Sequence, residues 1–385
     1  MNTLALHLER PERFHALAAA LAEFRPHLVL AFGASELFEP GGPAGRLAAA
    51  VPDAVVAGCS GAGAIAGGLV HDGTLSVAAM RFARAQVRLA TADVGAMDDA
   101  AAAGARTAAR LPVEGLRHVL LFGPGLDING SALVAGIRSA LPAAVGISGG
   151  LAADGTAFER TFTLAGPRAG ARQTVAVGLY GSTLRIASAA QGGWQPFGPA
   201  RHVRRCHANV LFELDDERAL DVYRRYLGEY ADGLPSSGRL FPFEILDAEH
   251  RPTGLMRTLQ AFDDAQGSLT LAGEVPPDGH LRLMHATTDR LVDAAEAAAA
   301  SVRRALHENA GDSLALIVSC DGRRLVMGDR VDEEVEAVAA CLGPGPALCG
   351  FYSYGEIAHA DFFGDCRLHN QTLTVTLIAE EEQDP

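Results

Sequence analysis

The chain has 385 residues, of which 49% are hydrophobic and 20% are charged, a composition typical of a folded protein with room for two domains. Its formal net charge of −14 argues against nucleic acid as a partner, since phosphate binding needs a basic face, and against adhesion to anionic membranes. All 32 cationic residues are arginine, which excludes a P-loop lysine and Schiff-base chemistry on lysine.

The N-terminal region gives the first indication of location. Residues 1–14 carry Glu9 and Glu12 and lack the basic head and apolar run of a secretory signal. The least charged window, 54–70, is broken by glycines and is too weakly apolar to span a bilayer. The six cysteines are scattered, so we expect reduced and mostly buried thiols. These features predict a cytoplasmic protein.

Apolar periodicity predicts a helix at 12–24 and then three units of the same order: strand, helix, strand, glycine turn and strand. The first unit is expected to have strands at 28–32, 54–57 and 75–82 and a helix at 44–51. A helix at 96–111 leads to the second unit, with strands at 118–122, 143–145 and 174–180 and a helix at 131–141. The third unit has strands at 314–319 and 372–378, a helix at 333–342 and a strand that begins near Leu348.

The sequence between the second and third units does not repeat this order of elements. A strand at 209–214, a helix at 217–226 and a linker-like run at 233–238 precede several β-rich segments and a helix at 289–307. We therefore expect an α/β fold of two domains with mixed sheets built from the repeated units, the second domain being more β-rich. The expected divisions are an N-terminal helix (1–25), an N-type domain (26–214), a connecting helix and linker (215–238), a C-type domain (239–379) and an acidic tail (380–385).

The glycine turns are the first candidate sites. Gly146–Gly150 matches the Gly-x-Ser-x-Gly pattern of a hydrolase, with Ser148 as nucleophile, but a turn signal at Asp154-Gly155 stands where the required helix should begin. We interpret Gly146 and Ser148 as parts of a tight turn with a ligand-facing hydroxyl. Gly58-Cys59-Ser60 resembles the Gly146–Gly150 run in its position after a strand. As a nucleophile, Cys59 would need a histidine base, which the sequence does not place.

Polar side chains at other strand ends add to this set. Asp127 and Asn129 follow the strand at 118–122 and precede a helix, where they act either as helix caps or as ligands of a polar molecule. Cys366-x-x-His369 is half of a zinc spacing whose second pair of ligands is missing. A non-covalent haem held by one histidine leaves no spacing signature, so His369, then His285 or His359, stand as candidate axial ligands of haem b.

Motifs along nearly the whole chain resemble the FIST family of bacterial sensory proteins, which combine an N-terminal and a C-terminal FIST domain. In the first half, the resemblance lies in Val55–Ser60, Val145–Gly150 and Asn209–Asp215. In the second half, it lies in Leu271–Pro276, Gly350–Glu356 and His369–Thr372, and the last two motifs together are quite specific.

This resemblance implies an intracellular sensory module that binds a small ligand, with amino acids proposed from genomic context. A subset of similar proteins is associated with b-type haem and nitric-oxide sensing and with a histidine kinase as partner. The sequence contains no recognisable kinase, cyclase or DNA-binding segment beside the two domains, so the signal is expected to leave through a partner protein.

The leading hypothesis is a ligand-binding sensor without catalytic activity, and the alternatives are a haem-based nitric-oxide sensor and a hydrolase- or thiol-type enzyme. We expect the ligand to be bound by polar groups at the strand ends and by aromatic walls. The expected binding residues are Cys59, Ser60, Asp127, Asn129, Gly146, Ser148, Tyr352, Tyr354, Glu356, His369 and Asn370.

Overall fold

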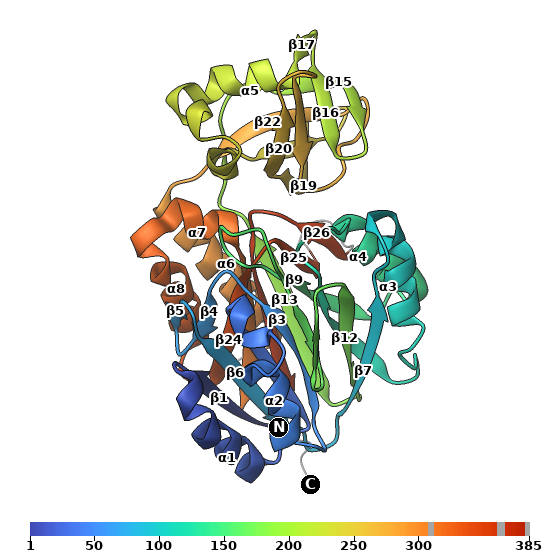
Figure 1. Ribbon diagram of the computed structural model, residues 1–385, viewed down its shortest axis with the longest axis vertical. Coiled ribbons are helices and arrows are strands. Elements are labelled where there is room, and N and C mark those ends of the chain that lie inside the picture. Colours follow the sequence, from blue (N-terminus) through green and yellow to red (C-terminus); the bar gives the residue numbers. More distant parts are fainter. Residues whose placement is uncertain (307–311, 360–365, 382–385) are drawn as a thin grey trace.

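Sheets with helices on their outer faces make up the body of the molecule, and a smaller lobe lies above them (Figure 1). The computed structural model describes residues 1–306, 312–359 and 366–381. Among them, residues 1–191 and those from 288 onward form the body, and residues 195–285 form the lobe. The expected α/β class with mixed sheets is confirmed. No helix in the described part of the chain is long and apolar enough to cross a membrane.

The body is built from three units with the same order of elements within the described residues. The first contains β1 (Asn2–Leu8), η1 (Pro11–Arg13), α1 (Phe14–Phe24), β2 (Leu28–Gly33), η2 (Ser35–Phe38), α2 (Pro43–Ala50), β3 (Val55–Ser60), the hairpin β4 (Ala64–Ala66) and β5 (Leu69–His71), and β6 (Leu75–Arg81). The second contains β7 (Gln86–Asp93), η3 (Met97–Asp99), α3 (Ala100–Ala108), β8 (Leu116–Gly123), α4 (Gly130–Ala140), β9 (Gly146–Leu151), the hairpin β10 (Thr163–Ala165) and β11 (Arg168–Gly170), and β12 (Gln173–Tyr180).

The third unit is interrupted by the lobe. It contains β13 (Leu184–Gln191), α6 (Thr288–Leu306), β23 (Ser313–Cys320), α7 (Asp321–Met327), η6 (Gly328–Arg330), α8 (Asp332–Leu342), β24 (Pro346–Ser353), the hairpin β25 (Gly355–His359) and β26 (Cys366–His369), and β27 (Leu373–Glu380). The expected helix at 289–307 is α6, except that residue 307 lies outside the described residues, as do residues 382–385 of the expected acidic tail.

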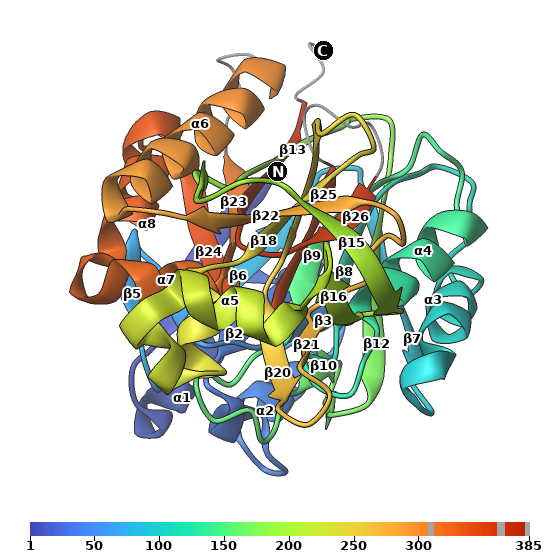
Figure 2. The same cartoon turned by 90° about the horizontal axis from the view of Figure 1, so that it is seen from above.

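Each unit completes the sheet of another unit. The sheet orders are β1-β6-β2-β3-β10-β11, β7-β12-β8-β9-β25-β26 and β13-β27-β23-β24-β4-β5, so each hairpin pairs outside its own unit. The central pairs β2–β3, β8–β9 and β23–β24 are parallel, because a helix crosses over between their strands, and the other pairs are antiparallel. Figure 2 shows the helix pairs α1–α2, α3–α4 and α6–α8 around the outside of these sheets.

The inner faces of the sheets share one apolar core. Phe32 of β2, Phe122 of β8 and Phe351 of β24 meet there, and all three are fully buried. The centroid of the Phe32 ring lies 5.4 Å from that of Phe122 and 4.8 Å from that of Phe351, and the centroids of Phe122 and Phe351 are 6.4 Å apart. One aromatic side chain thus comes from the centre of each unit. This core locks the units together and fixes where the strands end, which is the edge at which the cavities described below are found.

The glycine motifs form strand rather than turns, which corrects the expectation from sequence. Gly58, Gly149 and Gly350 take the same register position, each opposite a residue of the neighbouring parallel strand. A Cβ atom on any of them would overlap the backbone carbonyl of that residue, and Gly58 and Gly149 have positive φ angles of 152° and 141°. Gly58 therefore corresponds to Gly149 of the Gly146–Gly150 run, and not to its first glycine.

The lobe carries a nine-stranded sheet within the described residues, with the path β19-β18-β22-β15-β16-β21-β20. Its strands are β14 (Gln195–Pro196), β15 (Arg201–His207), β16 (Val210–Leu214), β17 (Glu217–Arg218), β18 (Phe243–Leu246), β19 (Pro252–Arg257), β20 (Leu259–Asp263), β21 (Ser268–Leu271) and β22 (His280–His285). Helix α5 (Ala219–Leu227) buries Leu220 and Tyr223 in the core of this lobe, and η4 (Gly228–Gly233) and η5 (Ser236–Leu240) lead on to β18.

Several elements were not expected from the sequence. The segment before α1 is strand β1, so residues 1–25 are not helical throughout. Strands β7 and β13 and the short hairpins were also missed. The region expected as the C-type domain, 239–379, is divided in space. Its residues up to 285 belong to the lobe, and its described residues from 288 onward complete the body.

Candidate functional site

A cleft of about 480 Å³ lies between the body and the lobe. The body contributes residues just after β8, β23 and β24, at the ends of strands that belong to parallel pairs. The lobe contributes Thr258, Leu259 and Gln260, and η5 contributes Arg239. Ligand sites are commonly built where parallel strands end and where two parts of a chain meet. We call this space the interlobe cleft.

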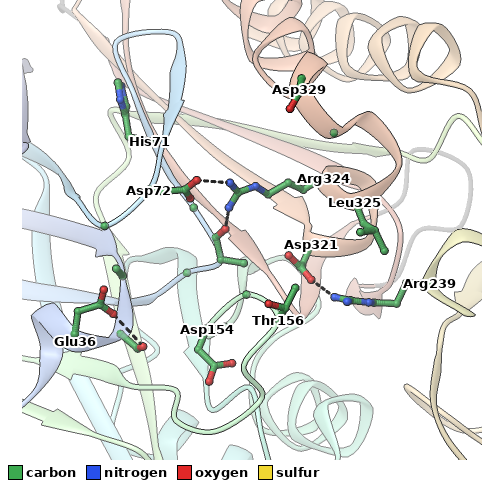
Figure 3. Close-up of a pocket in the computed structure, with 18 residues that line it drawn as sticks. Glu36, His71, Asp72, Asp154, Thr156, Arg239, Asp321, Arg324, Leu325 and Asp329 are labelled. Carbon is green, nitrogen blue, oxygen red and sulfur yellow. Dashed lines mark hydrogen bonds and ion pairs between the residues drawn. The ribbon is translucent and has the colours of Figure 1, made fainter. Parts of the chain in front are cut away.

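The interlobe cleft continues into a second hollow of about 560 Å³, which Figure 3 shows in close-up. Arg239 and Asp321 line both spaces. Carboxylates predominate over cations in the lining of the second hollow, so we call it the acidic hollow. Its charged residues are Glu36, Asp72, Asp154, Arg239, Asp321, Arg324 and Asp329. Arg324 pairs with Asp72 at 2.7 Å and donates to the carbonyl of Ala62.

An ion pair stands at the junction of the two spaces. Arg239 Nη1 lies 2.5 Å from Asp321 Oδ2, and both side chains are about 10% exposed (Figure 3). Burial raises the pKa of Asp321, although the guanidinium of Arg239 acts in the opposite direction. Gln371 ties this corner together, because its Nε2 donates to the backbone carbonyl of Arg239 and to Thr258 Oγ1, both at 3.0 Å. A charged pair is thereby held at the meeting point of body and lobe.

Asn370 is a buried residue of the cleft lining with an unsatisfied hydrogen-bond acceptor. It follows β26, its side chain lines the interlobe cleft, and it is only 2% exposed. Its Oδ1 has no hydrogen-bond partner among the described residues. A buried acceptor without a donor costs about 1–3 kcal/mol, so such groups usually have a partner in the functional state. Asn370 also lines a small side pocket of about 70 Å³ next to the cleft.

Two aromatic rings form one wall of the interlobe cleft. Tyr354 and Phe158 stack with ring centroids 4.7 Å apart and an interplanar angle of 7°. The hydroxyl of Tyr354 donates to Asp154 Oδ1 at 2.5 Å, and burial with this carboxylate raises the pKa of the phenol. The guanidinium of Arg239 lies 5.4 Å from the centroid of the Phe158 ring. Ion pair and aromatic wall are therefore in contact.

Only some of the expected binding residues come together in this space. Asp127, Tyr354 and Asn370 line the interlobe cleft, and Asn129 lines the side pocket. The Oδ1 of Asn129 accepts from the backbone N–H of Ala132 at 3.0 Å, so this residue caps α4, which was one of its two expected roles.

Other expected residues lie behind the wall of the cleft. The hydroxyl of Tyr352 donates to Glu334 Oε1 at 2.6 Å, and Ser353 Oγ donates to Glu356 Oε1 at 2.7 Å. Burial raises the pKa of Glu356 to about 7, against the lowering effect of its hydrogen bonds. Ser60 is fully buried and donates to the carbonyl of Ala153 at 2.8 Å. Tyr352, Glu356 and Ser60 do not line the interlobe cleft, the acidic hollow or the side pocket, whereas Ser353 lines the interlobe cleft.

The residues considered for nucleophilic chemistry lie elsewhere. Ser148 Oγ is 2.8 Å from His118 Nε2, so a histidine does stand within reach of this hydroxyl. Both residues are buried on strands β8 and β9, where Gly146 makes room for the imidazole ring. Burial lowers the pKa of His118 to about 3 and raises the pKa of Cys59. Neither the pair nor Cys59 lines the cavities described above.

The three histidines considered for haem lie outside the three cavities described above. His369 is 3% exposed, its Nε2 lies 3.2 Å from the carbonyl of Ala358, and burial lowers its pKa to about 4. His359 Nε2 accepts from the backbone N–H of Ile147 at 3.3 Å, and His285 packs on Phe197. None of the three lines the interlobe cleft, the acidic hollow or the side pocket. His369 and His359 are thus hydrogen-bonded to the backbone of the body.

Sequence reasoning missed the ion pair and half of the aromatic wall. Asp321 directly follows strand β23, and a carboxylate at the end of a predicted strand was a usable signal. Arg239 follows the run interpreted as a linker, and Phe158 lies in a loop. The last two become site residues only through contacts between distant parts of the chain.

Comparisons with known proteins give the family. The FIST N domain model matches residues 27–217, and the FIST C domain model matches residues 219–359. A search of curated proteins found no match. A solved structure of a cyanuric acid hydrolase from A. caulinodans is similar at 12% identity and a TM-score of 0.36, covering 99% of each chain, a likeness too weak to carry an argument. FIST domains are sensory domains that bind small ligands. On the two domain matches, the chain belongs to the FIST family.

Proposed function

We propose that this protein is a cytoplasmic sensor that binds an amino acid, or a related small zwitterion, in the interlobe cleft and signals through a partner protein. The observation that carries the proposal is that the ion pair of Arg239 and Asp321 lines the same cleft as Asn370, whose Oδ1 has no partner among the described residues. A guanidinium is suited to a carboxylate, and a carboxylate and an amide oxygen are suited to an ammonium group. The three groups match the head of an amino acid.

We expect the ligand to replace the direct ion pair between Arg239 and Asp321, and not to bind next to an intact pair. In the absence of ligand, Arg239 and Asp321 neutralise each other, which avoids a buried unpaired charge. A zwitterion offers each of them an opposite charge, so both remain paired when it enters. It also provides an N–H donor for Asn370, whose acceptor is otherwise unsatisfied. A neutral ligand, or one with a single charge, would leave a buried charge unpaired.

The same residues offer a route for the signal. Arg239 lies in η5, between the lobe helix α5 and strand β18, whereas Asp321 and Asn370 belong to the body. A ligand that replaces the direct ion pair changes the contacts between these two parts. A partner protein that recognises their relative position would then respond to the ligand, as population-shift models require.

A thermal-shift screen of the twenty amino acids tests the proposal with wild-type protein and the Arg239→Gln variant. A ligand present at 100 times its Kd stabilises the folded state by about 2.7 kcal/mol, which raises Tm by several degrees. We expect at least one amino acid to raise the Tm of the wild type, and the variant to lose that shift.

Arg251→Gln is the matched control, because Arg251 also pairs with carboxylates but is 72% exposed on the surface of the lobe. It should keep the full shift. A Tm that no amino acid changes would refute the proposal, and so would a shift that survives Arg239→Gln. An absorption spectrum of protein purified with haem available distinguishes an amino-acid sensor from a haem-based sensor. A haem-based sensor requires a Soret band in this spectrum.

A further inference from the structure

Large apolar side chains are left half-exposed inside the interlobe cleft. Phe158 is 49% exposed and Met97 is 54% exposed, and both line this space. Leu259 and Ile128 line the same cavity. Clustered exposed apolar side chains in a concave site are typical of a surface that a ligand or partner covers. The cleft is therefore polar at the ion pair and apolar at the aromatic wall.

Phe158 is held in place by a network of hydrogen bonds around Asp154. Asp154 Oδ2 accepts from the backbone N–H groups of Glu159 and Arg160 at 2.7 Å and 2.8 Å, and its Oδ1 accepts from Tyr354. Phe158 itself has a φ angle of 53°, a conformation that bulky residues rarely adopt. The fold thus positions an aromatic ring against Tyr354 with part of its surface open to the cleft.

We infer that the ligand of this cleft is an amino acid with an aromatic or large apolar side chain, and that Phe158 determines this specificity. The inference rests on the proposed function, which supplies the binding of the zwitterionic head at Arg239 and Asp321. The side chain of the ligand then packs on Phe158 and Met97, because these two large apolar side chains of the cleft are the most exposed and gain most from being covered. A small polar amino acid would leave the wall exposed.

Isothermal titration with L-phenylalanine and L-alanine tests the inference in three proteins: the wild type, Phe158→Ala and Phe197→Ala. Phe158 is half-exposed, so its removal should leave the fold intact. Phe197 is the control, because it is a 37% exposed aromatic residue that does not line the cleft. We expect wild-type protein to bind L-phenylalanine at least tenfold more tightly than L-alanine. Phe158→Ala should lose most of this preference, because its binding of L-phenylalanine weakens far more than its binding of L-alanine, while Phe197→Ala should behave like the wild type.

The outcomes separate this inference from the proposed function. Equal affinity of the wild type for the two amino acids, or an unchanged preference in Phe158→Ala, would overturn the inference and leave the proposed site standing. A wild-type protein that binds neither amino acid would overturn the inference, and the screen of the twenty amino acids would then decide the proposed function separately. Loss of both affinities in Phe158→Ala would also overturn the inference, since it would show a general effect on the cleft and not a choice between side chains.

Discussion

Substitution of Glu356 by glutamine should change how the stability of the protein depends on pH. Glu356 is fully buried and accepts from Ser353 Oγ at 2.7 Å and from the N–H and hydroxyl of Thr372 at 3.1 Å and 2.9 Å. Its donors are all neutral, so burial dominates and raises the pKa from its ordinary value of 4.5 to about 7. Glutamine keeps one acceptor oxygen for Thr372, and the hydroxyl of Ser353 can rotate to accept from its NH₂ group.

The sign of the effect follows from the raised pKa. Between pH 4.5 and pH 7 the folded state keeps a proton that the unfolded state releases, so the contribution to stability is complete below pH 4.5 and is lost as the pH rises through 7. One pKa unit corresponds to 1.36 kcal/mol, so the total loss is about 3 kcal/mol. The Glu356→Gln variant lacks this loss. Its free energy of unfolding relative to the wild type should therefore rise by about 2–3 kcal/mol between pH 5 and pH 8.

Urea denaturation followed by circular dichroism at several pH values measures this difference. Comparison of two proteins at each pH cancels the titration of His118 and His369, which both proteins share. Glu296→Gln on the exposed face of α6 is the control and should show no such trend. A difference between Glu356→Gln and wild type that stays constant from pH 5 to pH 8 would refute the reasoning, because it would mean that Glu356 titrates alike in both states.

Two further substitutions test the architecture of the body. Gly149→Ala should destabilise the protein by more than about 2 kcal/mol, because its Cβ would overlap a backbone carbonyl of β8, whereas Gly345→Ala, which faces open space, should change stability little. Arg323→Met should cost about 3–5 kcal/mol, because it leaves Glu334 buried without the cation that lies 2.7 Å away, while the half-exposed Arg330→Met should cost less than about 1 kcal/mol. Urea denaturation checks both pairs, and equal effects within either pair would contradict the stated cause.

Much of the α/β pattern could be predicted because apolar runs and helical periodicity are local signals. The expected strand at 28–32 is β2, and the expected helix at 131–141 is α4, shifted by one residue. The short hairpins could not be predicted in this way. Strands β4 and β10 have three residues each and gain their hydrogen bonds from the sheet of another unit. Their pairing is therefore determined by tertiary structure, which a local pattern does not contain.

The glycine motifs show a different limit of the sequence. A cluster of glycines usually indicates a turn, but here Gly58 and Gly149 let two parallel strands approach where a side chain would collide. A turn and a close approach of two strands both favour glycine, so the glycine content of the motifs could not distinguish between them. For the same reason, the sequence could not show which glycine of the Gly146–Gly150 run corresponds to Gly58.

Part of the candidate site could be predicted from the positions of the predicted strand ends. Tyr354 and Asn370 follow strands, and the rule that ligand sites form at strand ends was sufficient to select them. Arg239 and Asp321 are 82 residues apart, and they meet only because the lobe lies over the body. Ser60 and Tyr352 were selected by the same rule, but their side chains are used in hydrogen bonds inside the body.

Hydrogen–deuterium exchange of the wild-type protein, with and without a mixture of the twenty amino acids, tests the central claim most directly. If a ligand binds in the interlobe cleft, amide protection should increase in peptides that cover 234–240, 320–325 and 366–373, which contain Arg239, Asp321 and Asn370. Protection confined to other regions, such as the buried pair at His118 and Ser148, would contradict the account, and so would exchange that the mixture does not change.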